Sequence, residues 1–280
     1  MSTRTFFATV LLAASTISVY AADPVAAPAS KPAVDGFNGK LSFGGLYESA
    51  NGKDGYFYAD SSFSIPLGQR FGAQVDTALA INGDVTAGGV GAHVFWRDPS
   101  FGLLGGYGEI VYSSSGSPSI YRFGAEAEAY FDRFSVEAFA GVQDAEIIKP
   151  IFTGDLTLAF YPNDDLRLSA GVVRNFDETS GVIGLEYAFQ NSGTTQPVIF
   201  ANAEFGEDTT MVKAGLRLYF GQSSKSLIAR HREDDPRNRI QFGSVQSAGS
   251  GGTPPLTPEQ KCLADGGFWV SSDNFCDFPD

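Results

Sequence analysis

The sequence YRFGAEAEAYF, at residues 121–131, alternates between apolar and polar side chains along its whole length. Its odd-numbered positions are all Tyr, Phe or Ala, whereas the positions between them include Arg122, Glu126 and Glu128. An α-helix repeats every 3.6 residues and would mix the two sets, but a β-strand directs alternate side chains to opposite faces. The stretch therefore predicts a strand with one apolar face and one charged face.

The same alternation recurs between residues 37 and 220, in twelve stretches separated by turn-forming residues. Each stretch has about 9–13 residues, the length of a tilted strand that crosses a membrane, whereas strands of soluble proteins usually have about 5–6. We therefore predict an all-β protein, a membrane-spanning antiparallel up-and-down β-barrel of about 12 strands. The strands are expected to begin near Phe37, Gly55, Phe71, Asp84, Phe101, Ile120, Phe134, Phe152, Leu166, Gly181, Pro197 and Thr209.

The composition agrees with a barrel and argues against other classes of protein. The 280 residues include 33 Gly, 24 Phe and 11 Tyr but only 2 Cys, and the formal net charge is −13. This charge argues against a nucleic-acid partner, because neutralising phosphate requires Lys and Arg. A soluble β-sandwich is the alternative fold, but it would place the aromatic residues at the centres of the strands. Here they flank the turns in two girdles, as on the outer face of a membrane barrel.

Residues 1–21 have the features of a secretory signal peptide. Arg4 precedes an apolar core at residues 6–14, and small residues precede an expected cleavage after Ala21 or Ala22. Residues 22–36 are a Pro/Ala-rich linker, which we expect to be extended because proline disfavours helices and strands. An even number of strands places both ends of a barrel on one side of the membrane. The linker and the tail at residues 221–280 are therefore expected in the periplasm.

The signal peptide, the strand pattern and the final strand GLRLYF, which ends at Phe220, together resemble the β-barrel outer-membrane proteins of Gram-negative bacteria. The Pro/Ala leader resembles that of porin-like proteins from alphaproteobacteria. The resemblance implies an outer-membrane location, contact with outer-membrane lipids, and recognition of Phe220 by the barrel-assembly machinery as an assembly signal. The sequence departs from the pattern because Phe220 is not its last residue.

Charged residues within the strands fall on the face that we expect to line the lumen. A Lys or Arg on the lipid face at mid-depth costs about 2–4 kcal/mol, which favours inward positions. Acids and bases on neighbouring strands can then pair across the sheet. The predicted lumen-lining acids are Asp60, Asp76, Glu109, Glu126, Glu128, Glu137, Asp155, Glu186 and Glu204, and the bases are Lys40, Arg122, Arg167, Lys213 and Arg217, together with His93.

Such a wall permits two interpretations of the function. A polar lumen suits a porin-like passive channel for small hydrophilic solutes, and the excess of acids predicts a weak cation preference. Alternatively, the ion pairs fill a non-conducting structural barrel that supports envelope integrity. In a barrel of about eight strands, side chains fill the interior, whereas a barrel of about sixteen strands leaves an open channel. Twelve strands lie between these two cases.

A third interpretation, an outer-membrane lipid-modifying enzyme, requires a nucleophile beside a base. His93 is the one His of the predicted barrel, and it lies between Ala92 and Val94 with no Ser two residues away. We therefore expect no catalytic residues and no enzyme. One barrel His and two distant Cys do not make a metal-ligand set, so we predict neither a metal nor a cofactor.

Beyond Phe220 the alternation ends, and residues 221–280 are expected to form a mostly disordered periplasmic tail. Residues 244–258 are rich in Gly, Ser and Pro, which is typical of a flexible linker. Cys262 and Cys276 are close in sequence, and we predict that they form a disulfide in the oxidising periplasm. The resulting loop is a candidate for contact with peptidoglycan or a periplasmic protein.

Overall fold

The computed structural model describes residues 31–49, 54–83, 85–114, 119–145, 148–176, 178–189, 193–207, 209–221, 225–242, 268–270 and 275–277. The predicted signal peptide, the predicted linker at residues 244–258 and Cys262 lie outside these residues.

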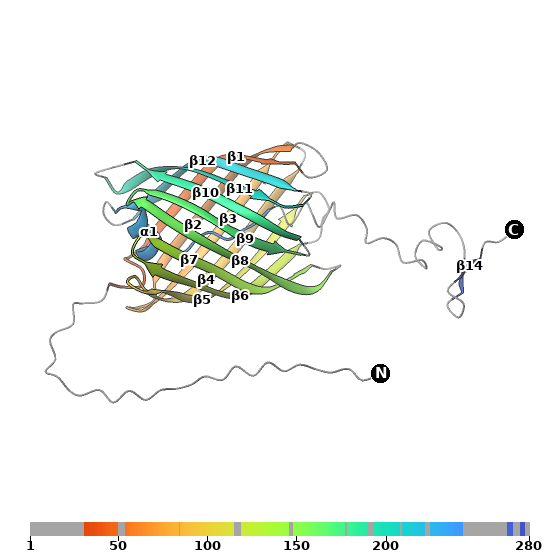
Figure 1. Cartoon of the computed structure of the whole chain (residues 1–280), viewed down its shortest axis with the longest axis horizontal. Coiled ribbons are helices and arrows are strands. Elements are labelled where there is room, and N and C mark those ends of the chain that lie inside the picture. Colours follow the sequence, from red (N-terminus) through yellow and green to blue (C-terminus); the bar gives the residue numbers. More distant parts are fainter. Residues whose placement is uncertain are drawn as a thin grey trace, which may run out of the picture. The chain divides into compact units, whose positions relative to one another are not determined.

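Twelve strands form one closed antiparallel barrel, as predicted (Figure 1). Each strand pairs with the next along the chain, and β1 pairs with β12 over ten residues from Gly39 to Glu48, which closes the sheet. The strands are β1 Asn38–Glu48, β2 Asp54–Pro66, β3 Phe71–Ile81, β4 Thr86–Asp98, β5 Gly102–Ser113, β6 Ile120–Phe131, β7 Phe134–Ala145, β8 Ile148–Asn163, β9 Leu166–Asn175, β10 Glu178–Ala188, β11 Thr195–Phe205 and β12 Thr210–Phe220.

Most strands begin within two residues of the expected position. The largest difference is β8, which begins at Ile148 rather than near Phe152, because its pairing with β7 continues to Ala145. Similarly, β10 begins at Glu178 rather than near Gly181, because it pairs with Asn175 of β9 from its first residue. In both places backbone pairing continues to the ends of the strands, where the side-chain alternation no longer marks it.

Short turns join the strands at the mouth of the barrel where β1 begins and β12 ends, which we call the near mouth. Two-residue connections at 132–133 and 164–165 link β6 to β7 and β8 to β9. Asp132 has a φ of +40°, the left-handed conformation that tight hairpin turns require and that Asp tolerates better than most residues. We call the opposite end of the barrel the far mouth.

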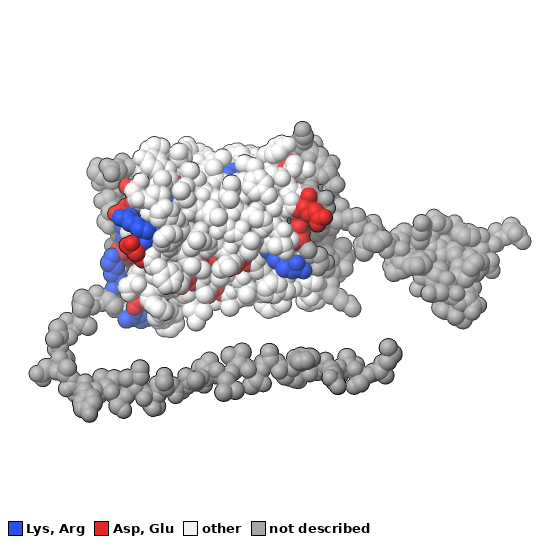
Figure 2. Space-filling model, viewed as in Figure 1, with Lys and Arg blue, Asp and Glu red and all other residues white. Residues whose placement is uncertain are grey.

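The outer face of the barrel is apolar. Phe123, Leu104 and Val94 each expose more than half of their surface, and Figure 2 shows a largely uncharged wall with Lys, Arg, Asp and Glu gathered towards its two ends. This is the outer face expected of a barrel in lipid. Among the described residues, no helix is long and apolar enough to cross a membrane.

The described part of the chain continues beyond the barrel. A short helix, α1, spans Leu227–Glu233, and a two-stranded hairpin pairs β13 (Phe268–Val270) with β14 (Phe275–Asp277). Figure 1 shows α1 at one end of the barrel, and its contacts place it at the near mouth.

Candidate functional site

All fifteen predicted lumen-lining residues lie on the inner side of the barrel wall. Lys40, Asp76, His93 and Glu126 are each at most 3% exposed, although neighbouring positions on the same strands are exposed. Asp155, Glu204, Lys213 and Arg217 are half-buried and line an internal cavity. The remaining seven, which are buried, are Asp60, Glu109, Arg122, Glu128, Glu137, Arg167 and Glu186.

Ion pairs join these residues between adjacent strands and across one intervening strand. Arg122 on β6 pairs with Glu109 on β5, its partner in register. Arg167 on β9 lies 2.8 Å from Glu137 on β7 and 3.5 Å from Glu186 on β10. Each contact satisfies charges that cannot face lipid, and together they tie the wall into a continuous polar lining.

His93 on β4 bridges two carboxylates. Its Nδ1 lies 2.8 Å from Glu126 of β6, and its Nε2 lies 2.9 Å from Asp76 of β3. The ring is also 4.4 Å from the ring of Tyr107, measured between centroids. Both ring nitrogens are therefore occupied by acids, so the imidazole links three strands and neither nitrogen faces a hydroxyl nucleophile.

Residues 225–242, which we call the lumen segment, lie inside this wall. From their sequence, residues 221–280 are expected to form a periplasmic tail, whereas in the structure residues 225–242 pack against lumen-facing side chains. The physical reason is complementarity, because the segment brings bases and apolar side chains to a wall that has more acids than bases and an apolar far end.

The segment begins with α1 at the near mouth. Ser226 caps the helix by accepting a hydrogen bond from the backbone N–H of Ala229, a favourable arrangement at a helix start. Leu227 is fully buried against Ala188, Val198 and Tyr219 of the wall. The backbone N–H of Ile228 donates to the carbonyl of Asp164 in the β8–β9 turn at 3.1 Å.

Polar side chains of α1 extend these contacts around the wall. His231 lies between the hydroxyls of Tyr161 and Tyr219, 2.9 Å from each. Arg230 donates to the side-chain carbonyl of Gln196 at 2.6 Å, and Arg232 donates to the backbone carbonyl of Phe134 at 2.9 Å. The helix thus contacts β7, β8, β11 and β12 as well as the near-mouth turns.

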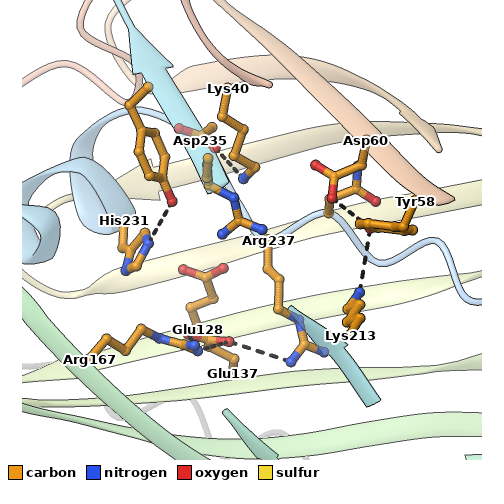
Figure 3. A pocket seen from close by; sticks show the side chains of 13 residues that line it. Lys40, Tyr58, Asp60, Glu128, Glu137, Arg167, Lys213, His231, Asp235 and Arg237 are labelled. Carbon is orange, nitrogen blue, oxygen red and sulfur yellow. Dashed lines mark hydrogen bonds and ion pairs between the residues drawn. The ribbon is translucent and has the colours of Figure 1, made fainter. Parts of the chain in front are cut away.

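After α1 the chain continues in an extended form along the lumen. Lys40 of β1 pairs with Asp235 and also donates to the carbonyl of Pro236 at 3.0 Å (Figure 3). Gln74 of β3 donates to the same carbonyl at 3.1 Å. These contacts fix the backbone of the segment where it leaves the helix.

Two arginines of the segment reach the opposite side of the wall. Arg237 lies 2.5 Å from Asp155 of β8 and 3.8 Å from Glu137 of β7. Arg239 lies 2.7 Å from Asp155 and 3.2 Å from Glu126. The segment therefore supplies bases to three acids of the wall (Figure 3 shows Arg237 beside Glu137).

The segment ends in an apolar cluster at the far mouth. Ile240 and Phe242 are 4% and 6% exposed, and they pack with wall residues that include Leu46, Tyr58 and Val111. The Phe242 ring meets the ring of Tyr58 edge-on, with centroids 6.1 Å apart. Without the segment these wall side chains would face a water-filled lumen.

The charges of wall and segment are complementary. The fifteen wall residues comprise nine acids and five Lys or Arg besides His93, an excess of four acids. Residues 225–242 carry five Lys or Arg and three acids, an excess of two bases. The segment thus offsets half of the acidic excess.

Asp234, at the near-mouth end of the segment, has a perturbed pKa. Burial raises the pKa of its carboxyl from 3.8 to about 6, although the Lys225 ammonium lies 2.6 Å away and Arg230 3.3 Å away, which both act in the opposite direction. The cost of desolvating the carboxylate exceeds the attraction of its two partners.

Two cavities of about 130 and 40 Å³ lie beside the segment, and both are lined in part by Arg167, Lys213, Arg217 and Arg237. Cavities of this size hold small clusters of water. The arrangement is that of a barrel occupied by its own chain, with pockets left around the occupant.

Two buried charges of the wall were missing from the predicted lumen set. Arg97 is the last residue but one of β4, is fully buried, and donates to the carbonyl of Ala33 at 3.2 Å. Glu48 is 3% exposed at the end of β1. In both cases the strand extends farther than its alternation indicates.

No protein-family model matches the chain, and no curated protein matches its sequence. Its fold is similar to several solved outer-membrane barrels. The KdgM porin in complex with disordered oligogalacturonate aligns with a TM-score of 0.50 and 11% identity, over 65% of this chain and 99% of that one. The translocator domain of autotransporter NalP from Neisseria meningitidis also gives 0.50 and 11%, over 67% and 88%. The outer membrane phospholipase dimer from Salmonella typhi gives 0.47 and 13%, over 71% and 94%. The first two likenesses, at a TM-score of 0.50, show the fold.

Proposed function

We propose that the protein is an outer-membrane β-barrel that its own lumen segment keeps closed to bulk solutes. The observation that carries this proposal is the pairing of Arg237 and Arg239 with Asp155, Glu126 and Glu137. A chain that only rested in a water-filled pore would not bury the Arg239 guanidinium and pair both arginines with acids of β6, β7 and β8.

The apolar outer face supports the location in a membrane. Large apolar side chains such as Phe123 and Leu104 are exposed on the wall, while the wall charges face inward. This is the arrangement of a barrel surrounded by lipid. The predicted signal peptide would bring the chain to the periplasm, from which outer-membrane barrels assemble.

A closed barrel acts first as a membrane anchor. Its partners in this proposal are outer-membrane lipids around the wall and the assembly machinery that recognises the last strand. We propose no hydrolytic activity, since His93 is held by Asp76 and Glu126 and His231 by Tyr161 and Tyr219. Neither imidazole has a serine hydroxyl among these partners.

Passive transport of small hydrophilic solutes is the second candidate. It is favoured by the polar lining, which an anchor does not require, and by the ion pairs that hold the segment, which could be exchanged for water and salt. In this function the segment would have to leave the lumen. The wall would then have nine acids against five Lys and Arg, which favours cations.

Planar-bilayer recording of the refolded full-length chain separates the two candidates. A closed barrel gives no conductance steps at neutral pH and moderate salt, although heat-modifiable migration on a gel shows that the barrel is folded. Frequent steps in such a preparation would refute closure and favour the channel.

A further inference from the structure

The lumen segment passes from one mouth of the barrel to the other. Its first part contacts the near mouth, where Ile228 bonds to the β8–β9 turn. Its last part, at Ile240 and Phe242, packs against residues near the ends of strands that turn at the far mouth, including Leu46 and Val111. Gln241 also accepts a hydrogen bond from Asn175, the last residue of β9.

The near mouth also holds the beginning of the described chain. Ala33 donates its backbone N–H to the carbonyl of Gln69 in the β2–β3 turn at 2.9 Å, and Asp35 donates to the carbonyl of Glu233 in α1 at 3.2 Å. A chain that is exported by the predicted signal peptide reaches the outer membrane from the periplasm. The mouth that carries residues 33–35 then faces the periplasm, and the far mouth faces outward.

We infer that the residues beyond Phe242 are held on the outer side of the membrane, so that the barrel carries this region through its own lumen and anchors it at the cell surface. The inference rests on the proposed function, because a segment that leaves the lumen would hold nothing in place. It adds a display function, which closure alone does not require.

The contacts hold the segment in one register. Leu227 anchors it at the near mouth, Arg237 and Arg239 anchor it at mid-lumen, and Ile240 anchors it at the far mouth. A methyl group added at Gly89 of β4 would lie 2.7 Å from Cγ2 of Ile240, so the wall is shaped to the segment at this point. A shift of the segment by one residue along the lumen would break its contacts at the near mouth, at mid-lumen and at the far mouth together.

The chain beyond the lumen has enough length to extend from the surface. The 25 residues between Phe242 and β13 can span up to roughly 80 Å when extended, at about 3.3 Å per residue. The β13–β14 hairpin could therefore stand clear of the lipid headgroups, where an extracellular partner can reach it.

An epitope-accessibility experiment tests this topology in the full chain. One variant has a short peptide epitope between Gly251 and Gly252, and a matched control has the same epitope between Ala29 and Ser30, which precede in sequence the near-mouth residues 33–35. We expect antibody to bind the first variant on intact cells and the control only after the outer membrane is permeabilised. Binding to the first variant only after permeabilisation would overturn the inference, and so would binding to the control alone on intact cells.

A crosslink covers the case in which an inserted epitope disturbs the lumen. In a Cys262→Ser, Cys276→Ser background, Gly89→Cys with Ile240→Cys should form a disulfide in the folded barrel, and Gly89→Cys alone should form none. Absence of the crosslink in a folded barrel would contradict the register. If the folded barrel gives no conductance steps in bilayers but the epitope is periplasmic, only the surface-display inference fails. If the unmodified barrel gives conductance steps, the proposed closure fails.

Discussion

The Arg239 guanidinium, which follows the barrel in sequence, lies 2.7 Å from the Asp155 carboxylate at the inner face of β8. The side chain of Arg239 is 2% exposed and that of Asp155 is 5% exposed, so the contact is withdrawn from bulk water. Removing one partner of such a buried pair leaves an uncompensated charge, which is much more costly than the loss of an exposed pair. The position of the lumen segment therefore depends on this contact more than on any surface ion pair.

Replacing Arg237 and Arg239 with Gln should release the segment. Asp155 and Glu126 would lose their bases from the segment, and breaking a buried pair in this way costs about 3–5 kcal/mol. We expect conductance steps in planar bilayers from a barrel that still migrates as a compact species on gels. The control is Arg70→Gln, which removes an exposed pair with Asp98 at the near mouth and should leave the bilayer silent. A silent double variant would show that the segment does not depend on its arginines.

Truncation after Phe220 should leave a folded barrel, because the pairing of β1 with β12 closes the sheet without later residues. The apolar far-mouth cluster would lose Ile240 and Phe242, so we expect the compact band to convert at a lower temperature than in the full chain. Heat-modifiable migration measures both effects. Loss of the compact band at every temperature would mean that the lumen segment is needed for the barrel to fold.

The barrel could be predicted because the alternation of apolar and polar residues that indicates each strand is a local feature of the sequence. A strand with lipid on one side and polar contacts on the other must alternate, and the stretch at 121–131 does so without interruption. The direction of each side chain then follows from its phase. For this reason the fifteen predicted lumen residues could be named before any pairing was known, although their individual partners could not.

The lumen segment could not be predicted in the same way, because its contacts are long-range. Nothing within residues 225–242 specifies Asp155 or Lys40 as partners, and the mixed charges of the segment are typical of a solvated tail. One partial signal was present, since the predicted wall set has four more acids than Lys and Arg, and residues 225–242 have two more Lys and Arg than acids. Arg97 and Glu48 were missed for a local reason, because strand pairing continues where alternation is already lost at the strand ends.

Asp234 predicts an acid-stabilised helix at the near mouth. Burial raises the pKa of its carboxyl from 3.8 to about 6 in the folded protein, so the folded state binds this proton more tightly than the unfolded state does. The contribution of the Asp234 proton to the free energy of unfolding is fully present below about pH 4 and is lost as the pH rises to about 6. Above that pH the free energy of unfolding no longer changes through this group. Two pKa units correspond to about 3 kcal/mol.

Asp234→Asn should therefore remove part of the pH dependence of thermal stability between pH 4 and 7. The measurement is the midpoint of thermal unfolding across this range, compared with Asp164→Asn, which alters an exposed pair in the β8–β9 turn. If the Asn variant keeps the slope of the parent chain, another group is responsible for it.

Cys262 and Cys276 should form a disulfide in the exported protein. The two residues are 14 positions apart, and a bridge closing a loop of this length stabilises the closed form by about 3 kcal/mol. Mass spectrometry of outer-membrane preparations, with and without reduction, checks the expectation. Recovery of both thiols in alkylated form without reduction would contradict it.

A barrel emptied of its lumen segment should prefer cations. Truncation after Phe220 leaves the nine acids and five Lys or Arg of the predicted wall set, and that excess should raise the concentration of cations along the lumen. The preference should decline with salt, because the screening length is about 10 Å at 0.1 M. Reversal potentials under a KCl gradient measure it.

Acids of the wall that differ in their partners allow a matched comparison of variants that tests this cation preference. On truncation Glu126 loses Arg239 at its Oε2 and keeps His93 at its Oε1, so Oε2 becomes available to solutes. Glu128 lies two residues along the same strand. Glu126→Gln with Glu128→Gln should therefore reduce the cation preference of the truncated barrel. Glu109→Gln should change it less, because Arg122 already neutralises Glu109 within the wall. An anion-selective truncated barrel would show that Arg167, Lys213 and Arg217 control the narrowest part of the lumen.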